Sequence, residues 1–235
     1  MSFQFKQFFV RDNQCALKVG TDSVLLGAWS FQHASLNHVL DVGAGSGVLS
    51  LMIAQRFPNA FVHALEIDDI AAQQCHENFK KSPFFDRLSL SWTDFRDFKP
   101  SIKYDAIICN PPYFTRGSLS SSDDRRNIAR QNLCFELGDL FALAKFWLND
   151  ESSPVSLIYP AEQAPKIITV ALEHGFFLMK QMNISNKKGA KPKRALLQFS
   201  RKVDILRKKV FFLKDSSERP TAEYIHLCKD FYLHF

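Results

Sequence analysis

Apolar runs of strand length alternate with helical patterns through most of the chain. The strand-length runs cover 38–42, 61–66, 88–92, 155–159 and the residues that lead to Asn110. Apolar positions at helical spacing cover about 47–57, 69–81, 136–149 and 161–174. Because strands that alternate with helices pair in parallel through right-handed crossovers, the pattern predicts an α/β fold with helices on both faces of a sheet.

The first 30 residues show a different pattern. Partly alternating apolar residues at 3–10 predict a short hairpin with Asp12 and Asn13 at its turn. Thr21 and Asp22 are expected to cap a short helix that follows them. This segment therefore forms an arm in front of the first central strand.

After residue 175 the apolar runs are again of strand length. Runs at 176–184 and 195–200 predict two strands joined by a basic loop, and 210–213 is a candidate extra strand. No stretch has the composition of a linker, so we expect a single domain over 1–235. Its expected parts are an N-terminal arm or lid, a core and a C-terminal extension (1–35, 36–200 and 201–235).

A glycine-rich turn follows the first central strand. Asp41 precedes Gly43, Gly45 and Gly47, which stand at alternate positions before a helical pattern. Glycine accepts positive φ and lets the backbone approach a ligand closely, and the helix N-terminus favours an anionic group. The spacing differs from the G-x-G-x-x-G of dinucleotide sites, and a carboxylate at Asp41 suits a positively charged or hydroxyl-bearing ligand. A tight turn without a ligand is the alternative.

The second motif, Asn110-Pro111-Pro112-Tyr113, ends another central strand. The prolines lack N–H donors but keep their carbonyl acceptors, and Asn110 offers one acceptor and two donors. Tyr113 offers a flat face for stacking. Parallel strands place both motifs at one edge of the sheet, where the groups together suit a planar ligand that bears an amine. A surface proline turn with a buried tyrosine is the alternative.

The positive charge of the chain lies in one segment. Residues 187–209 hold ten bases and one acid, a local charge of +9, whereas the whole chain carries +6 and the remainder therefore −3. Such a segment favours a phosphate-rich partner, whose binding is salt-dependent. A merely solvated surface is the alternative.

The composition makes several classes of protein improbable. The chain is 46% hydrophobic and 23% charged, as in ordinary globular proteins, and no apolar run is long enough to predict a membrane helix. Its five cysteines contain no C-x-x-C pair, which fits a reducing cytosol and predicts no metal site. No signal peptide is recognisable, so we expect a cytoplasmic protein without a membrane partner.

The two motifs together resemble those of the class I S-adenosylmethionine-dependent methyltransferases that modify planar amines. These are adenine N6-methyltransferases and the glutamine N5-methyltransferases of release factors. The N-terminal runs Phe5–Phe8 and Ala16–Trp29 and the C-terminal Asp230–Leu233 more specifically resemble the bacterial valine-tRNA adenine-37 N6-methyltransferases. The resemblance implies a Rossmann-like fold whose mostly parallel sheet has seven strands, with an antiparallel hairpin at its edge.

The resemblance also implies residues for the cofactor, S-adenosylmethionine. Glu66, at the end of the second strand, is placed to accept the ribose hydroxyls, whereas Asp94 and Phe95 follow the third strand and would hold the adenine ring. Residues of the arm would form a lid beside the cofactor, namely Lys18, Gly20, Thr21 and Asp22, with a packing arm as the alternative. The other expected cofactor residues are Asp41, Gly43, Gly45, Gly47 and Asn110.

Asn110, Pro111, Pro112 and Tyr113 are the candidate catalytic residues. Hydrogen bonds from the target amine to the Asn110 side-chain oxygen and the Pro111 carbonyl would draw its nitrogen toward a tetrahedral, nucleophilic geometry, and Tyr113 would stack on the base. No cysteine is placed for a covalent mechanism. The candidate tRNA contacts are Arg125, Arg126, Arg130, Lys187, Lys188, Lys191, Lys193 and Arg194.

The predicted function is thus N6-methylation of adenosine 37 in a valine tRNA, by a monomer without a metal ion. Two alternatives stay open: N5-methylation of a release-factor glutamine, and a non-catalytic tRNA-binding module with a vestigial cofactor pocket. The basic segment and the Lys18–Trp29 run favour the tRNA enzyme. A NAD-dependent dehydrogenase fits both motifs poorly.

Overall fold

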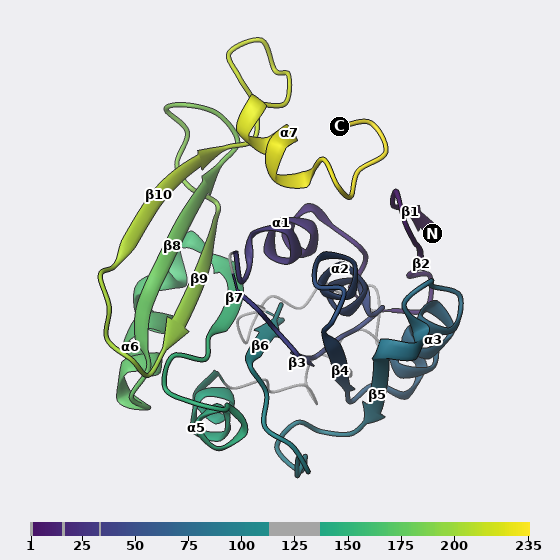
Figure 1. The fold of residues 1–235 in the computed structure, drawn as a ribbon. Helices are drawn as coiled ribbons and strands as arrows, with labels where there is room; N and C mark the ends of the chain where they lie inside the picture. The colour runs from purple at the N-terminus through teal and green to yellow at the C-terminus, as the bar shows by residue number, and fades with distance from the viewer. Residues whose placement is uncertain (1, 16, 33, 113–136) are drawn as a thin grey trace, which may run out of the picture.

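Eight strands form one sheet in the computed structural model, which describes residues 2–15, 17–32, 34–112 and 137–235 (Figure 1). In sheet order the strands are β10 (Arg207–Phe212), β8 (Phe177–Ser185), β9 (Arg194–Ser200), β7 (Val155–Pro160), β6 (Ala106–Cys109), β3 (His38–Val42), β4 (Phe61–Glu66) and β5 (Leu88–Trp92). Strand β9 runs antiparallel to both of its neighbours, and every other pair is parallel. The α/β prediction is confirmed.

Helices cover both faces of the sheet and enclose two apolar cores. One core contains side chains of α1 (Thr21–Trp29), α2 (Val48–Arg56) and α3 (Asp69–Lys80). The other contains side chains of α5 (Leu137–Trp147) and α6 (Ala164–Glu173), and the short 3₁₀ turns η1 (Phe85–Arg87) and η2 (Ala161–Gln163) precede β5 and α6. Because successive strand residues face opposite sides, Val39 packs in the first core and Leu40 in the second.

The sheet has one strand more than the seven expected. Strand β10 pairs in parallel with β8 over Arg207–Phe212, longer than the predicted run at 210–213, and forms the sheet edge. The antiparallel pair β8–β9 therefore lies inside the sheet and not at its edge. Residues 207–210 of β10 are exposed, so no apolar alternation marked them as a strand.

The N-terminal hairpin exists, but its turn was predicted in the wrong place. Strands β1 (Ser2–Gln4) and β2 (Phe9–Arg11) are joined by a turn in which Phe5 N donates to Phe8 O at 2.9 Å. Asp12 begins the next turn, where its carboxylate accepts from Val19 N at 2.9 Å. Thr21 is the first helical residue of α1 and not its cap, because Gly20 holds the N-cap position and supplies no side chain.

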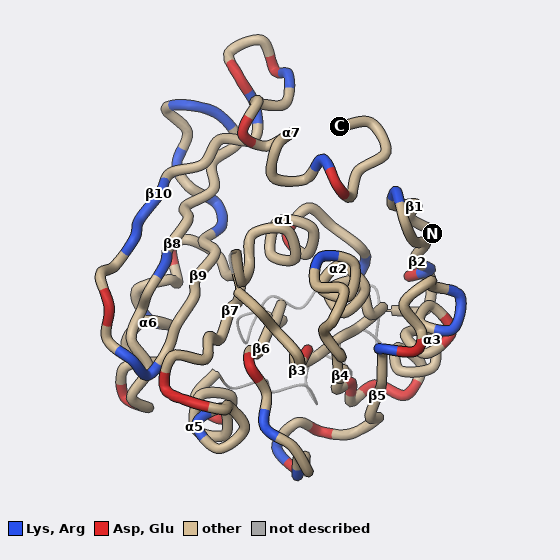
Figure 2. Tube along the Cα trace, viewed as in Figure 1, with Lys and Arg blue, Asp and Glu red and all other residues tan. Residues whose placement is uncertain are grey.

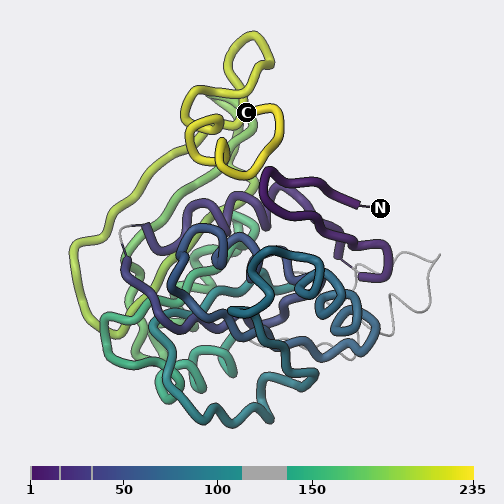
Figure 3. The backbone as a smooth tube through the Cα atoms, turned by 45° about the vertical axis from the view of Figure 1, so that its right-hand side comes forward, coloured from purple at the N-terminus to yellow at the C-terminus, as the bar shows by residue number. Residues whose placement is uncertain are grey.

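The C-terminal extension lies against the N-terminal arm and α1, as Figure 3 shows. Lys6 N donates to Phe231 O at 2.9 Å, and Phe231 is buried. Helix α7 (Ala222–Cys228) contacts α1, and side-chain hydrogen bonds link Tyr224 and Tyr232 to each other and to Thr21. The extension thus supports the N-terminal end of α1. Within the described ranges, no helix is long and apolar enough to span a membrane.

Candidate functional site

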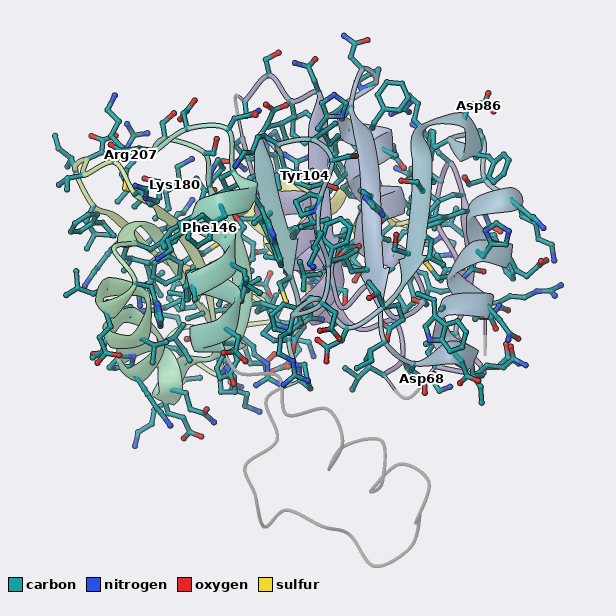
Figure 4. The ribbon with its side chains drawn as sticks, turned by 90° about the horizontal axis from the view of Figure 1, so that it is seen from below. Asp68, Asp86, Tyr104, Phe146, Lys180 and Arg207 are labelled. Atoms are coloured by element: carbon teal, nitrogen blue, oxygen red, sulfur yellow. The ribbon has the colours of Figure 1, made fainter. Side chains whose placement is uncertain are left out.

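The predicted motifs meet at one end of the parallel strands, which we call the carboxyl edge because β3, β4 and β6 end there. Figure 4 places Asp68, which follows β4, and Tyr104, which precedes β6, at opposite ends of the sheet. Strand β3 pairs with both β4 and β6, so the glycine turn lies between the ends of two neighbouring strands. Val42 is opposite Leu65 and Cys109 in this register.

The three glycines of the turn all have positive φ, of 74° at Gly43, 56° at Gly45 and 80° at Gly47. A Cβ at Gly43 or Gly45 would meet no atom of the described residues within 4 Å, so none of these residues fills the space beside this part of the turn. A Cβ at Gly47 would lie 2.5 Å from Phe79 Cε1. The first two glycines can therefore admit a ligand, whereas the third lets the turn pack against α3.

Asp41 lies beneath this turn and is fully buried. Its Oδ2 accepts from Ser50 Oγ at 2.7 Å, and the carboxylate also accepts from the Ser50 backbone N–H. Burial raises the pKa of Asp41 from 3.8 to about 7. Among the described residues its Oδ1 has no hydrogen-bond partner. Asp41 thus binds the first turn of α2 from inside the protein.

Glu66 holds the glycine turn from the neighbouring strand. Its Oε2 accepts from Gly45 N at 2.7 Å and its Oε1 from Asp68 N at 2.9 Å. Burial raises the pKa of this carboxyl, and the backbone hydrogen bonds oppose the rise. The Ile67 backbone N–H also donates to this carboxylate, which leaves one of its four lone pairs free. Glu66 can therefore brace the turn and still accept from one ligand hydroxyl.

A cavity of about 330 Å³ joins the N-terminal end of α1 to the proline turn after β6. Its size falls within the range of small-molecule sites. Six of its lining residues were expected from the sequence, four from the N-terminal arm and two from the proline turn. These two groups lie 88 or more residues apart along the chain. The lining comprises Leu17, Lys18, Gly20, Thr21, Asp22, Ser23, Asn110 and Pro112.

Asn110 is held in this cavity through one side of its amide. Its Nδ2 donates to Ser23 Oγ at 2.9 Å. Its Oδ1 is buried and has no hydrogen-bond partner in the described part of the chain. A buried acceptor without a partner costs about 1–3 kcal/mol, so an incoming N–H donor would be stabilised there. Cys109, just before it, is buried, which raises the pKa of its thiol well above the ordinary range and keeps it protonated.

The other cavity residues of the arm are tied to the protein as well. Lys18 Nζ donates to Asp12 O at 2.6 Å and Cys15 O at 3.1 Å, which closes the turn before α1. Asp22 Oδ2 accepts from Arg194 Nε at 2.6 Å. Arg194 was expected to contact RNA, and in the structure it connects β9 to the cavity wall.

Asp94 and Phe95 lie apart from this cavity, beyond the end of β5. Asp94 forms a bidentate ion pair with Arg96, whose Nε is 3.0 Å from both carboxylate oxygens, and this lowers the pKa of Asp94. Phe95 is buried in the second core. Their proposed contacts with the adenine ring stay a prediction.

The basic segment divides between the two ends of the sheet. The loop between β8 and β9 lies at the carboxyl edge. Three lysines in this loop form no ion pair with any described residue. We call these three, Lys188, Lys191 and Lys193, the carboxyl-edge lysines. Lys187, in the same loop, pairs with Glu218 at 2.8 Å. At the opposite edge lie the far-edge bases, which are Arg201, Lys202 and Arg207 (Figures 2 and 4).

Several predicted residues lie outside the described ranges, namely Tyr113, Arg125, Arg126 and Arg130. Ser23 and Leu17 line the cavity but were not predicted. Ser23 directly follows Thr21 and Asp22, so its place in the same helical turn was the available signal.

Comparison with known proteins identifies the family of the chain. A family model for the methyltransferase small domain matches residues 17–133. A relative from Bacteroides thetaiotaomicron named tRNA1(Val) (adenine(37)-N6)-methyltransferase is 38% identical over 99% of this chain and 97% of its own. A Haemophilus influenzae protein of the same name is 37% identical over 99% of both chains. The solved structure of a predicted O-methyltransferase from Agrobacterium tumefaciens superposes with a TM-score of 0.70 at 17% identity, covering 89% of this chain and 96% of its own.

The structural likeness establishes the fold alone, whereas the sequence likeness extends over the arm, the core and the C-terminal extension. It therefore includes both the cavity wall from α1 and the proline turn. The chain belongs to the family of the tRNA1(Val) (adenine(37)-N6)-methyltransferases.

Proposed function

We propose that this protein transfers a methyl group from S-adenosylmethionine to the N6 amine of adenosine 37 in the anticodon loop of a valine tRNA. The observation that carries the proposal is the Asn110 side chain, which presents a buried acceptor without a partner among the described residues, in a cavity at the carboxyl edge. An N–H group of the target amine would supply the missing donor. The membership of the family selects adenosine in tRNA over other planar amines.

The residues of the carboxyl edge fit the cofactor. The described residues leave room for a close ligand beside Gly43 and Gly45, and the remaining lone pair of Glu66 suits a ribose hydroxyl. Thr21, Asp22 and Asn110 extend this region into the cavity. S-adenosylmethionine supplies an activated methyl group on a sulfonium, so the protein mainly has to orient the reacting groups.

Asn110 and Pro111 are assigned to the target base. The Asn110 Oδ1 and the Pro111 carbonyl would accept from the two N–H groups of the amine, so that the nitrogen lone pair leaves conjugation with the ring. A proton can leave the amine after transfer, and no described side chain is needed as a strong base. The buried Cys109 thiol, whose pKa is raised well above its ordinary range, is unsuited to a covalent mechanism.

A loop adenosine suits this arrangement because it is single-stranded and is unstacked at lower cost than a paired base. The carboxyl-edge lysines lie at the same end of the sheet as the cavity. We infer that they contact tRNA phosphates while the base enters the cavity. Such a substrate also accords with action in the cytoplasm.

The test is a transfer assay with labelled S-adenosylmethionine and three acceptors: an unmodified valine tRNA transcript, the same transcript with guanosine at position 37, and a release factor. We expect label only in the first, recovered as N6-methyladenosine after digestion. Label in the release factor would support the glutamine alternative. Label in both transcripts would place the target at another adenosine.

Asn110→Ala tests the assignment of the site. The variant should lose transfer by at least about a hundredfold, because an acceptor aimed at the reacting amine is removed, and should still bind tRNA and cofactor. Asn37→Ala is the matched control, since Asn37 is exposed just before β3, at the opposite end of the sheet. Full activity in Asn110→Ala would refute the assigned geometry. If the variant loses both methyl transfer and tRNA binding, the loss would point to misfolding.

A further inference from the structure

We propose that Ser23 is a positioning residue that orients the Asn110 amide for methyl transfer. The inference rests on the proposed function and concerns a residue that only the structure brings into the site. Ser23 lies in the first turn of α1, is almost completely buried, and lines the cavity together with Asn110. Its Oγ accepts from Asn110 Nδ2 at 2.9 Å.

The two ends of an asparagine amide have nearly the same shape and opposite hydrogen-bonding character. Only the oxygen end can accept from the target amine, so a flipped amide would present a donor to a donor. Among the described residues, Ser23 is the only hydrogen-bond partner of this side chain. The Ser23 hydroxyl can accept from Nδ2 or donate to Oδ1, but when the target amine donates to the other end of the amide, only the orientation with Nδ2 on Ser23 and Oδ1 on the amine pairs both ends.

The support for Ser23 is itself rigid. Val24 N donates to Gly20 O at 3.3 Å in the first turn of α1, and Asp22, one residue before Ser23, is held by Arg194. Val24, Leu25 and Leu26 are buried in the first core. Because its helix is fixed by buried side chains, the Ser23 hydroxyl can hold the plane of the Asn110 amide in one position, as a preorganised site requires.

Removal of the hydroxyl should affect the chemical step more than binding. We expect Ser23→Ala to lower the single-turnover rate constant about two- to tenfold at saturating tRNA and cofactor, the effect of one neutral hydrogen bond. The dissociation constant of S-adenosylmethionine and the fraction of active sites should stay as in the wild type. Ser23→Thr, which keeps a hydroxyl at this position, should recover most of the rate.

Ser30→Ala is the matched control. Ser30 follows the same helix and is buried, its Oγ has no partner in the described ranges, and the substitution is identical. It should leave the rate constant unchanged. If Ser30→Ala lowers it equally, the effect of Ser23→Ala belongs to α1 packing and the inference is overturned.

Two further outcomes would overturn the inference. A wild-type rate constant in Ser23→Ala would show that the amide is oriented without Ser23. Weaker cofactor binding or fewer active sites at an unchanged rate constant would assign Ser23 to cofactor binding or to folding. If the wild-type protein transfers no methyl group to tRNA, both the proposed function and this inference fail. If the wild type is active, a result that contradicts the prediction for Ser23→Ala refutes the role of Ser23 alone.

Discussion

Replacing Asp41 by Asn is expected to remove most of the pH dependence of stability between about pH 4 and 7. Burial raises the pKa of Asp41 in the folded protein from 3.8 to about 7, and the hydrogen bonds from Ser50 only partly oppose the rise. Over this interval the folded carboxyl retains a proton that the unfolded chain has released. The contribution of Asp41 to the free energy of unfolding therefore falls as the pH rises. His63, whose pKa is lowered by burial, contributes in the opposite direction in both the wild type and the variant.

The size of the effect follows from the same values. Each unit of pKa difference corresponds to about 1.4 kcal/mol. A rise from 3.8 to about 7 therefore lowers the free energy of unfolding by at most about 4 kcal/mol once the pH exceeds 7. Asn keeps an oxygen that can accept from Ser50 but has no charge to desolvate. Glu66 has a raised pKa too, so Asp41→Asn should retain a shallower fall in the same direction.

Urea unfolding followed by circular dichroism at several pH values between about 4 and 8 measures this difference. Asp86→Asn is the control, because Asp86 is exposed in η1 and its variant should follow the wild-type curve. The reasoning is refuted if the difference in the free energy of unfolding between the wild type and Asp41→Asn does not change with pH in the predicted direction. Cofactor affinity in the same variant separates two roles: a change of more than about tenfold at equal stability would mean that Asp41 contacts the ligand.

Two other predictions concern the surface and the glycine turn. Changing the three carboxyl-edge lysines together to Gln should lower tRNA affinity and reduce the slope of log affinity against log salt by about 2 to 3. The same change at the three far-edge bases should leave the slope nearly unaltered. Equal effects of the two changes would contradict the assignment of tRNA binding to the carboxyl-edge lysines. Gly47→Ala should lower the free energy of unfolding by more than the ~1–3 kcal/mol that a strained backbone costs. The reason is that the added Cβ would also lie 2.5 Å from Phe79 Cε1. Gly175→Ala, with φ of 79° and no neighbour within 4 Å, should cost less in urea unfolding, and the reverse order would contradict the packing argument.

The central elements could be predicted from the sequence because their side chains are buried in regular patterns. Strand β4 has the predicted bounds, and β3 and β5 agree as well, since each strand is flanked by polar residues and a helical pattern. Edge elements lack this signal. Strand β10 exposes Arg207, Lys208 and Lys209, so burial imposed no alternation on them, and only pairing with β8 defines the strand.

The site was predictable as a set of residues but not as a set of contacts. Lys18 and Asn110 were both candidates, and the structure places them around one cavity because the N-terminal end of α1 lies at the carboxyl edge. Ser23 was not recognised, because a serine in the first turn of a helix is ordinary in any sequence and its place beside Thr21 and Asp22 was only a weak signal. Its importance depends on its distance to Asn110, which tertiary packing alone determines.

The contacts also separate the residues that hold the site from those left to meet a ligand. Asp41 binds Ser50, Glu66 binds Gly45 and Asp68, and Asp22 binds Arg194, so these acids are already engaged with the protein. Charged groups fixed in this way need little reorganisation when a ligand arrives, which lowers the cost of ordering the site. The Asn110 oxygen differs, because it is a neutral acceptor on a side chain that lines the cavity. The amide is anchored at its nitrogen, and the oxygen, like Asp41 Oδ1 beneath the turn, is buried without a described partner. A site built from anchored acids and one unpaired neutral acceptor favours recognition of an uncharged N–H donor, as the exocyclic amine of adenine is.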